Sequence, residues 1–291
     1  MEVLQLTIAG VAIGCIYALI ALGFVLIYKA TEVVNFAQGD IMMLGAFVAF
    51  TFADLWKLPF IVSVIFAIAV LAVVGALFDR LLLRRIIGQP TFAAVMVTIG
   101  AGFVIRGVAT MIPGWGTDTH ALKAPYSDGV VRAGGLSIST DHIAIIVLTA
   151  ALCGVLYIFF KKTRMGIAMQ ASSQNQLAAN YMGIPVRRIN TLIWAISAGV
   201  AAFAAVLLAP ITFVHSNMGF IGLKAFPAAV VGGFGSIPGA IVGGLIIGLV
   251  ESFAGFYLPE GFKDTAPYIV VLLVLFIRPS GIFAEMRKKK V

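Results

Sequence analysis

NFAQGD, residues 35–40, is a polar hexapeptide between two stretches that are apolar enough to lie in a lipid bilayer. Residues 3–26 carry no charge, and residues 41–53 are again uncharged. The second stretch is shorter than the roughly 20 residues that a helix needs to cross a bilayer. A spanning helix must therefore begin near Val33 and carry the hexapeptide to the membrane edge or inside it. Polar side chains at that depth are costly unless they face other helices or a wet cavity, so this segment is the first candidate for a transport path.

The composition indicates an integral membrane protein. Of the 291 residues, 61% are hydrophobic and 11% are charged, and the mean hydropathy is +1.08. A soluble core could not bury this much apolar surface. The first apolar stretch is too long for a removable signal peptide and has no basic leader. Cys15 and Cys153 both lie inside apolar stretches, which predicts two free, buried thiols and no disulfide.

Charge-free windows predict an all-α polytopic fold with about seven to eight transmembrane helices. The eight apolar stretches are Leu6–Tyr28, Val33–Ala53, Leu58–Phe78, Thr91–Ile112, Ile143–Phe160, Ile189–Ala209, Ala225–Val250 and Pro267–Ile277. We expect a single transmembrane domain over residues 1–291, with a cytoplasmic coupling loop at 161–188 and an outer loop at 113–141.

The distribution of charge predicts how this domain is oriented. Basic residues fall in three blocks, at 80–85, 161–188 and 278–290, and these blocks are expected in the cytoplasm together with Lys29. The loop at 113–141 contains three aspartates against two basic residues, so it is expected outside. The net charge of +8 is therefore attributed to orientation in the membrane and not to nucleic-acid binding.

The number of crossings poses a problem that the seventh apolar stretch is expected to resolve. An outer N-terminus and an inner C-terminus require an odd number of crossings, but there are eight stretches. The segment GGFGSIPG would not continue a helix; its breaking residues are Gly232, Gly233, Gly235, Pro238 and Gly239. We expect a half-helix, a break near residues 225–239, and a helix from about Ala240 to Tyr257. The alternative is eight full spans with an inner N-terminus.

Small residues recur at four-residue spacing, which lets helix backbones approach closely. The clearest sets are Gly10, Gly14 and Ala18, and Ala240, Gly244 and Gly248. We expect these faces to pack within the chain, with a subunit interface as the alternative.

The loop from Thr163 to Arg188 is too long for a simple turn. Residues 167–181 favour a helix, Gly183 is a stop signal, and Pro185 follows it. A compact cytosolic helix followed by a glycine turn is what a permease would present to a soluble motor. The alternative is an ordinary basic surface loop.

Three motifs together resemble the inner-membrane permeases of branched-chain amino-acid ABC transporters, of the high-affinity leucine/isoleucine/valine type. They are the hexapeptide at 35–40, the loop segments 163–168 (TRMGIA) and 182–184 (MGI), and the stretch 222–226 (GLKAF), continuing through the glycine-rich segment to Glu251. RPSGI at 278–282 also fits, and the similarity covers essentially the whole chain. The loop departs from the family pattern at Gln170–Ala171 and Gln174–Asn175, which suggests a matched, slightly different motor.

The resemblance implies a permease subunit of a binding-protein-dependent importer that translocates branched-chain amino acids, or related small amino acids and amides, by alternating access. The implied partners are a second permease subunit in a heterodimer, two cytosolic ATP-binding subunits, a periplasmic substrate-binding protein and membrane lipid. The implied location is the bacterial inner membrane. The chain has no Gly-x-x-x-x-Gly-Lys-Ser/Thr phosphate loop, so it is not expected to be the ATPase or any other enzyme, and no cofactor, metal or nucleic acid is implied.

The candidate site residues fall into two groups. Translocation-path candidates are Asn35, Gln38, Gly39, Asp40 and Arg106, with hydrogen bonding that fixes the fold as the alternative role. ATPase-coupling candidates are Arg164, Gly166, Ala171, Gln174, Asn175 and Gly183. Arg106 lies roughly 22 Å along its helix and is expected to snorkel outward or to attract a substrate carboxylate. Glu251 is expected to pair with a neighbouring subunit or to bind an ammonium group. His120, His142 and His215 are expected to be surface or interface histidines.

Two other classes compete with the permease interpretation. A stand-alone secondary transporter of small organic solutes would bind substrate and a coupling ion near the midplane, using broken helices such as Phe226–Gly239. It would need a buried acidic group, and the one candidate, Asp40, is expected near a membrane edge. A membrane enzyme would need clustered nucleophilic, acid–base or metal-binding groups, and the sequence contains no such cluster.

Overall fold

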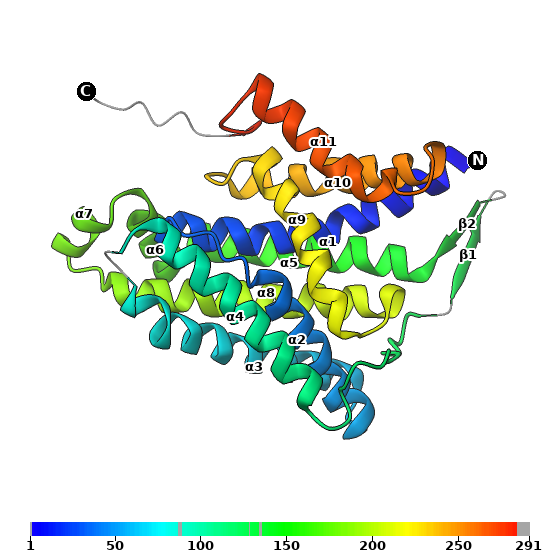
Figure 1. The fold of residues 1–291 in the computed structure, drawn as a ribbon, viewed down its shortest axis with the longest axis horizontal. Helices are drawn as coiled ribbons and strands as arrows, with labels where there is room; N and C mark the ends of the chain where they lie inside the picture. Colours follow the sequence, from blue (N-terminus) through cyan, green and yellow to red (C-terminus); the bar gives the residue numbers. More distant parts are fainter. Residues whose placement is uncertain (1, 87–88, 128, 134–135, 284–291) are drawn as a thin grey trace.

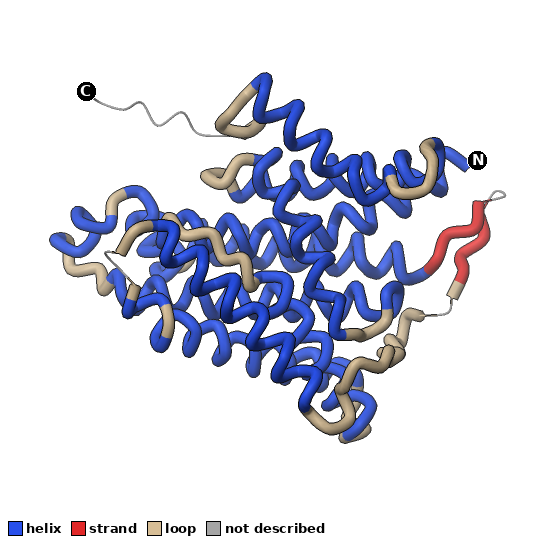
Figure 2. Tube along the Cα trace, in the orientation of Figure 1, coloured by secondary structure: helices blue, strands red, loops and turns tan. Residues whose placement is uncertain are grey.

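The computed structural model describes residues 2–86, 89–127, 129–133 and 136–283, and most of them lie in helices (Figures 1 and 2). The longer helices are α1 (Glu2–Thr31), α2 (Gln38–Phe50) continued by η1 (Thr51–Leu55), α3 (Phe60–Leu81), α4 (Thr91–Met111), α5 (Thr140–Lys162), α8 (Val186–Thr212) and α10 (Ile237–Tyr257). The shorter ones are η2 (Leu83–Arg85), α6 (Arg164–Gln174), α7 (Gln176–Tyr181), η3 (Ser216–Met218), α9 (Gly219–Gly232) and α11 (Phe262–Ile277). In the described chain, seven helices are long and apolar enough to cross a membrane, with α2 and η1 forming one of them. The predicted all-α polytopic fold is confirmed.

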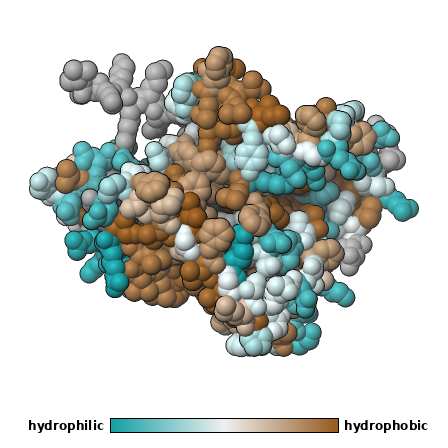
Figure 3. Space-filling view, viewed as in Figure 1, coloured by the Kyte–Doolittle hydropathy of each residue, from teal (hydrophilic) through white to brown (hydrophobic). Residues whose placement is uncertain are grey.

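Helices α1 and α8 lie at the centre of the bundle, and α3, α4 and α5 lie at its periphery. The apolar windows of α1 and α8 are 89% and 78% buried, whereas those of α3, α4 and α5 are only 17–22% buried. The exposed positions of these three outer helices carry large apolar side chains, such as Ile65, Phe103 and Val155, as expected of a lipid-facing surface. Figure 3 shows apolar side chains across the middle of the molecule and hydrophilic ones gathered at the end that carries α6 and α7.

The predicted cytoplasmic blocks of basic residues come together in space. Arg84 in η2 donates a hydrogen bond to the backbone carbonyl of Arg187 at the start of α8, at 3.2 Å. The first two blocks therefore lie on the same end of the bundle, as the charge pattern predicted. Of the third block, Arg278 lies within the described residues, and residues 287–290 lie outside them.

The small-residue faces of α1 and α10 pack directly against each other. A Cβ atom added to Gly248 would lie 2.3 Å from the Cα atom of Gly14, and one added to Gly244 would lie 2.5 Å from the Cα atom of Ala18. The pairing of 14 with 248 and of 18 with 244 makes the two helices antiparallel. The predicted packing of these faces within the chain is confirmed.

The seventh apolar stretch is broken, as the sequence indicated, but its helices have different bounds from those expected. Helix α9 crosses the bundle obliquely (Figure 1) and ends at Gly232. After the four residues 233–236, α10 begins at Ile237, earlier than the predicted Ala240. Gly233 turns the chain with φ +96°, which glycine tolerates without strain. Pro238 lies in the first turn of α10 and not in the break, because its missing N–H is tolerated there.

Close backbone contacts hold α9 and α10 together as an antiparallel hairpin. A Cβ atom on Gly232 would lie 2.0 Å from the carbonyl oxygen of Gly239, and one on Gly243 would lie 2.1 Å from that of Ala228. Phe234 in the break packs against Tyr28, near the basic end of α1, with ring centroids 5.0 Å apart. The break therefore lies at the end of the bundle where α1 carries its basic residue, Lys29. Helix α9 has 14 residues and is not one of the seven helices that are long enough to cross a membrane.

The RPSGI motif completes the end of α9. The N–H of Ile282 donates to the carbonyl of Val231 at 2.9 Å, and that of Phe283 donates to Gly232 at 3.2 Å. The last carbonyls of a helix have no partner inside the helix, so these bonds satisfy groups that would otherwise be left open at the break. Gly281, with φ +84°, lets this segment turn against Gly233.

The second spanning helix begins later than predicted. Residues 33–37 are not helical, and α2 starts at Gln38 instead of near Val33. The side chain of Asn35 explains the difference, because its Oδ1 accepts a hydrogen bond from the N–H of Ala37 at 3.1 Å. Such local bonds compete with helix formation. The lost length is recovered at the other end, where the π-helical η1 extends the span to Leu55.

The outer loop contains a β-hairpin that the sequence did not predict. Strands β1 (Val130–Ala133) and β2 (Leu136–Ser139) pair antiparallel, with Val130 opposite Ser139 (Figure 2). The loop is tied to the bundle by a β-bridge between His120 and Val214. The His120 ring packs 4.5 Å from that of Phe50. His120 is thus half-buried where the outer loop contacts α2. The two cysteines are free, as expected, but Cys153 is only half-buried.

Candidate translocation site and coupling surface

The polar hexapeptide lies inside the bundle, where its side chains bond to one another. Asn35 and Gln38 are fully buried, and the Asn35 Nδ2 donates to the Gln38 Oε1 at 3.1 Å. Ser197 of α8 donates to the carbonyl of Gly23 at 3.0 Å and lies 3.4 Å from the same Gln38 oxygen. The Nε2 of Gln38 has no hydrogen-bond partner in the described part of the chain. An unpaired buried donor of this kind is uncommon in proteins.

Asp40 and Arg106 form an ion pair between α2 and α4, in which Asp40 is buried and Arg106 is partly buried. The Arg106 Nε and Nη2 atoms donate to the Asp40 Oδ1 at 3.0 and 2.7 Å. The guanidinium carbon also lies 4.0 Å from the ring centroid of Phe220 in α9. The prediction that Arg106 snorkels outward is therefore wrong, because a partner of opposite charge inside the bundle compensates its charge. Asp40 is likewise buried inside the bundle.

Helix α9 crosses the hexapeptide at van der Waals contact because both backbones carry glycine. A Cβ atom on Gly222 would lie 2.3 Å from the Cα atom of Gly39, and one on Gly39 would lie 2.1 Å from the carbonyl oxygen of Gly219. A Cβ atom on Gly219 would lie 2.6 Å from the Asp40 Oδ1. The first turn of α9 therefore rests on the ion pair, where the positive end of the helix dipole favours the carboxylate.

An aromatic cluster lies between this polar site and the cytoplasmic break. Phe226 of α9 is its centre, with ring centroids 5.8 Å from Phe24, 5.4 Å from Phe36 and 5.6 Å from Phe234. Tyr28 extends the cluster through Phe234. These rings were not among the predicted site residues, although Phe36 and Phe226 belong to two of the motifs. The site is thus polar at the level of Asp40 and closed by apolar rings on its cytoplasmic side.

A second buried network involves Glu251, which was predicted to pair with another subunit. Instead, the Tyr17 hydroxyl donates to Glu251 Oε2 at 2.5 Å, and the Lys224 Nζ lies 3.5 Å from Glu251 Oε1. Lys224 also forms an ion pair with Asp264 of α11. Glu251 is buried among groups of its own chain, so the predicted pairing with a neighbour is wrong. The network links α1, α9, α10 and α11.

The predicted coupling loop forms two short helices instead of one. Asn175 separates α6 from α7, and its Oδ1 accepts a hydrogen bond from the N–H of Ala178 at 3.0 Å, so it is the N-cap of α7. Gly183 ends the segment with φ +80°, as its sequence position predicted. Gly166 is buried, because a Cβ atom there would lie 2.3 Å from the carbonyl oxygen of Phe159. Gly166 and Asn175 thus shape the loop.

Other residues of the loop present its outer surface. Arg164, Gln174 and Gly183 are exposed, and Ala171 is half-buried. The two most exposed apolar side chains of this loop are Tyr181 and Met182, which are 88% and 83% accessible and were not among the predicted site residues. Leu177 is also largely exposed. Exposed apolar patches are typical of surfaces that contact another protein or a membrane.

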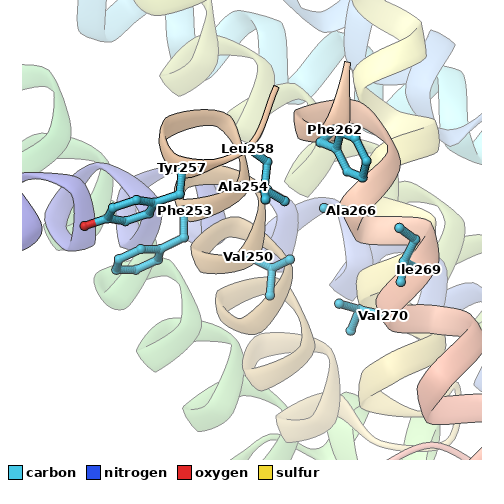
Figure 4. A pocket seen from close by; sticks show the side chains of 9 residues that line it. All are labelled: Val250, Phe253, Ala254, Tyr257, Leu258, Phe262, Ala266, Ile269 and Val270. Carbon is cyan, nitrogen blue, oxygen red and sulfur yellow. The ribbon is translucent and has the colours of Figure 1, made fainter. Parts of the chain in front are cut away.

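A groove between α10 and α11 lacks the features of a substrate site (Figure 4). Its volume is about 440 Å³, and its nine lining side chains are apolar or aromatic. The hydroxyl of Tyr257 is directed away from the groove, as Figure 4 shows. A binding site needs a few convergent polar groups to orient a solute, so the groove is not a candidate for the transport path.

The lipid-facing helix bundle, the buried polar site crossed by a broken helix, and the exposed loop helices define a membrane permease. The chain belongs to the family described as branched-chain amino acid transport system / permease component, which matches residues 6–277. It is an ABC importer permease, a multi-pass membrane protein and not an enzyme.

Similar proteins include transporters with different named substrates. The chain is 32% identical to the high-affinity branched-chain amino acid transport system permease protein LivH of Escherichia coli, over 99% of this chain and 97% of that protein. It is 31% identical to BraD of Pseudomonas aeruginosa, over 99% and 98%. It is 24% identical to the fructose import permease protein FruG of Bifidobacterium longum, over 88% and 77%. A solved structure titled PsaBC from Streptococcus pneumoniae in complex with Fab shares the fold, with a TM-score of 0.50, 17% identity, and coverage of 95% of this chain and 92% of that one.

Proposed function

We propose that this chain translocates branched-chain amino acids, or closely related small amino acids, as one permease subunit of an importer driven by separate ATP-binding subunits. The similarity to LivH and BraD supports this substrate class, since it covers nearly the whole chain at 31–32% identity. The fructose permease is a more distant relative, at 24% identity.

The observation that carries the proposal is the buried Asp40–Arg106 pair beneath α9. An amino acid is a zwitterion, so its ammonium group can replace Arg106 at Asp40 while its carboxylate replaces Asp40 at Arg106. Each buried charge then keeps a partner while α2 and α4 separate, which avoids the penalty of an unpaired charge. A neutral sugar offers no such exchange. The unpartnered Nε2 of Gln38 would add a donor to the path.

In this proposal, alternating access is a movement of the α9–α10 hairpin relative to α2 and α4. Glycine contacts let α9 slide on the hexapeptide, and separation of the rings around Phe226 opens the path toward the cytoplasm. A second permease subunit would complete the path in a heterodimer. A periplasmic binding protein would dock on the outer loop at 113–141, and two ATPases would engage the coupling loop at 161–188 of the inner-membrane complex.

Mild-detergent purification of the tagged chain from its native membrane tests the proposal. We expect two ATP-binding subunits and a second permease to copurify, and reconstituted proteoliposomes to accumulate leucine only with ATP and the binding protein. A chain that is isolated alone and transports without ATP would contradict the proposal and support a stand-alone secondary transporter. ATP-driven uptake of a sugar but not of leucine would contradict the proposed substrate.

The coupling loop provides a more specific prediction. Substituting Gln174→Glu together with Asn175→Asp is expected to change the number of leucine molecules carried per ATP severalfold, because two charges are added to the proposed motor contact. Aspartate at 175 keeps the oxygen that caps α7, so the loop should stay folded. The control is Asn217→Asp, at an exposed position on the outer side. An unchanged transport ratio in the double variant would rule out a motor contact at these two residues.

A further inference from the structure

Arg106 lies within one of the apolar helices and still reaches the protein surface. It precedes the last residue of α4 by five positions, or about 7.5 Å along the helix. Its side chain is 17% exposed, even though it is paired with Asp40. The other charged residues of the outer helices α3, α4 and α5 lie in the first or last turn of their helix. Arg106 is therefore the charged group that these helices present away from their ends.

The ion pair with Asp40 uses only part of the guanidinium group. A guanidinium carries five N–H donors. The Nε and Nη2 atoms of Arg106 donate to the Asp40 Oδ1 at 3.0 and 2.7 Å, which leaves the Nη1 atom outside these two bonds. The same bonds prevent the side chain from extending toward the lipid headgroups. Because lipid chains cannot accept a hydrogen bond, an exposed guanidinium at this position favours contact with protein.

Aromatic side chains from two helices surround the exposed edge of Arg106. The guanidinium carbon lies 5.9 Å from the ring centroid of Phe103 in α4 and 4.0 Å from that of Phe220 in α9. The two rings are 64% and 48% exposed. Helices α4 and α9 thus meet on one face of the bundle (Figure 1). Arginine and aromatic side chains are enriched at the centres of protein–protein interfaces.

The short length of α9 also favours coverage of this face by protein. With 14 residues, α9 is about 21 Å long, which is less than the roughly 30 Å of the hydrocarbon core. Its first turn rests on the Asp40–Arg106 pair, so α9 begins beside α4 and not beyond the end of α4. The first N–H groups of a helix have no partner inside the helix. Lipid cannot satisfy such groups, whereas a second protein can.

We infer that the surface formed by Phe103 and Arg106 of α4 and Phe220 of α9, here named the α4–α9 surface, packs against the second permease subunit. That subunit covers both rings and brings an oxygen acceptor to the Nη1 of Arg106. The inference rests on the proposed function and extends it, because it places the Asp40–Arg106 pair at the boundary between the two subunits. A solute that passes the pair would then contact both of them.

The charges on these helices favour a related subunit over a second copy of this chain. Helices α4 and α9 contain no acidic residue, and their charged residues are Arg106 and Lys224. In a two-fold symmetric dimer the same surface patch lies on both sides of the interface. A copy would therefore oppose two arginines without supplying a further carboxylate from these helices. A related permease can carry an acceptor at the facing position instead.

Photocrosslinking in native membranes tests the α4–α9 surface. The photoreactive amino acid p-benzoylphenylalanine replaces Phe103 or Phe220 in the tagged full-length chain. Ile65 of α3, which is 61% exposed, is replaced in the same way as a matched control. Mass spectrometry after illumination and purification identifies the attached protein. We expect positions 103 and 220 to attach to one second permease, and position 65 to give at least tenfold less of that product.

Three substitutions measure what the α4–α9 surface contributes to assembly. Phe103→Ala removes an exposed ring, so the isolated chain should keep its melting temperature while the amount of copurified second permease falls at least about fivefold. Ile65→Ala should leave both quantities unchanged. Arg106→Lys keeps a positive charge beside Asp40 but loses the Nη1 donors, so it should also lose the second permease. A melting temperature of Arg106→Lys close to that of the wild type shows that the chain remains folded.

The outcomes separate this inference from the proposed function. Attachment of positions 103 and 220 to a second copy of this chain, or equal attachment from position 65, would overturn the inference. So would full copurification of the second permease with both Phe103→Ala and Arg106→Lys. A second permease that copurifies but attaches at neither position would overturn the inference while leaving the proposed function intact. If no second permease copurifies with the wild-type chain, the proposed function itself is contradicted.

Discussion

Asp40→Asn is expected to destabilise the chain by about 3–5 kcal/mol, because it leaves the charge of Arg106 unpaired inside the bundle. Arg106→Gln should destabilise the chain by a comparable amount, because it leaves the charge of Asp40 unpaired. The double variant Asp40→Asn/Arg106→Gln removes both charges and is expected to recover most of the lost stability. Thermal unfolding of the purified chain in detergent measures these differences. A matched control is Asp54→Asn, which breaks the exposed pair with Lys57 and should cost less than about 1 kcal/mol.

Transport by the same variants shows whether the Asp40–Arg106 pair belongs to the transport path or only stabilises the fold. If the pair exchanges partners with a zwitterion, the double variant will be folded but will carry leucine at least tenfold more slowly, since neither charge of the substrate finds a partner. Uptake by proteoliposomes containing the ATPases and the binding protein gives the measurement. Wild-type uptake in the folded double variant would show that the pair only stabilises the fold, which was the alternative role considered for the hexapeptide.

Gly222→Ala is expected to cost about 1–3 kcal/mol and to impair transport, because the added methyl group would lie 2.3 Å from the Cα atom of Gly39. The methyl group is fixed to the α9 backbone and the atom that it meets belongs to the backbone of Gly39, so no side-chain rotation can relieve the clash. Gly107→Ala in α4 is the matched control, since a Cβ atom there meets nothing within 4 Å. It should leave stability unchanged or raise it by up to about 1 kcal/mol through helix propensity.

The melting temperatures and the yields of folded protein from membranes provide the comparison. If Gly222→Ala is as stable and active as Gly107→Ala, the close crossing of α9 over the hexapeptide is not required for function. The same pair of variants also tests the sliding movement proposed for α9, because a methyl group at the crossing would hold the two helices apart.

Much of the fold could be predicted because lipid imposes a simple local rule on the sequence. A helix that faces hydrocarbon must be apolar along its whole length, so charge-free windows located α3, α4, α5 and α8 to within a few residues. Glycine and proline interrupt helices through their own backbone properties, so the break before α10 was also predictable. The β-hairpin was not, because β1 and β2 are short and lie in a polar loop without hydrophobic periodicity.

The sequence indicated which residues belong to the candidate site, but it did not indicate which residues they contact. Asn35, Gln38 and Asp40 stood out because polar residues in an apolar region are costly, and the structure places all three inside the bundle. Arg106 was recognised as unusual, but its inward direction depends on a carboxylate 66 residues away. Glu251 was misassigned for the same reason, since its partners Tyr17 and Lys224 come from other helices.

The sequence by itself determined that this protein crosses the membrane many times, which end carries the basic residues, and where one helix must break. Each of these properties follows from the solvation of a single segment by lipid or water. Only the tertiary structure decided that Asp40 faces Arg106, that α9 lies across Gly39, and that Phe220 packs on the guanidinium of Arg106. Those features depend on which helices pack together, and contacts between distant segments leave no periodic signal in the chain.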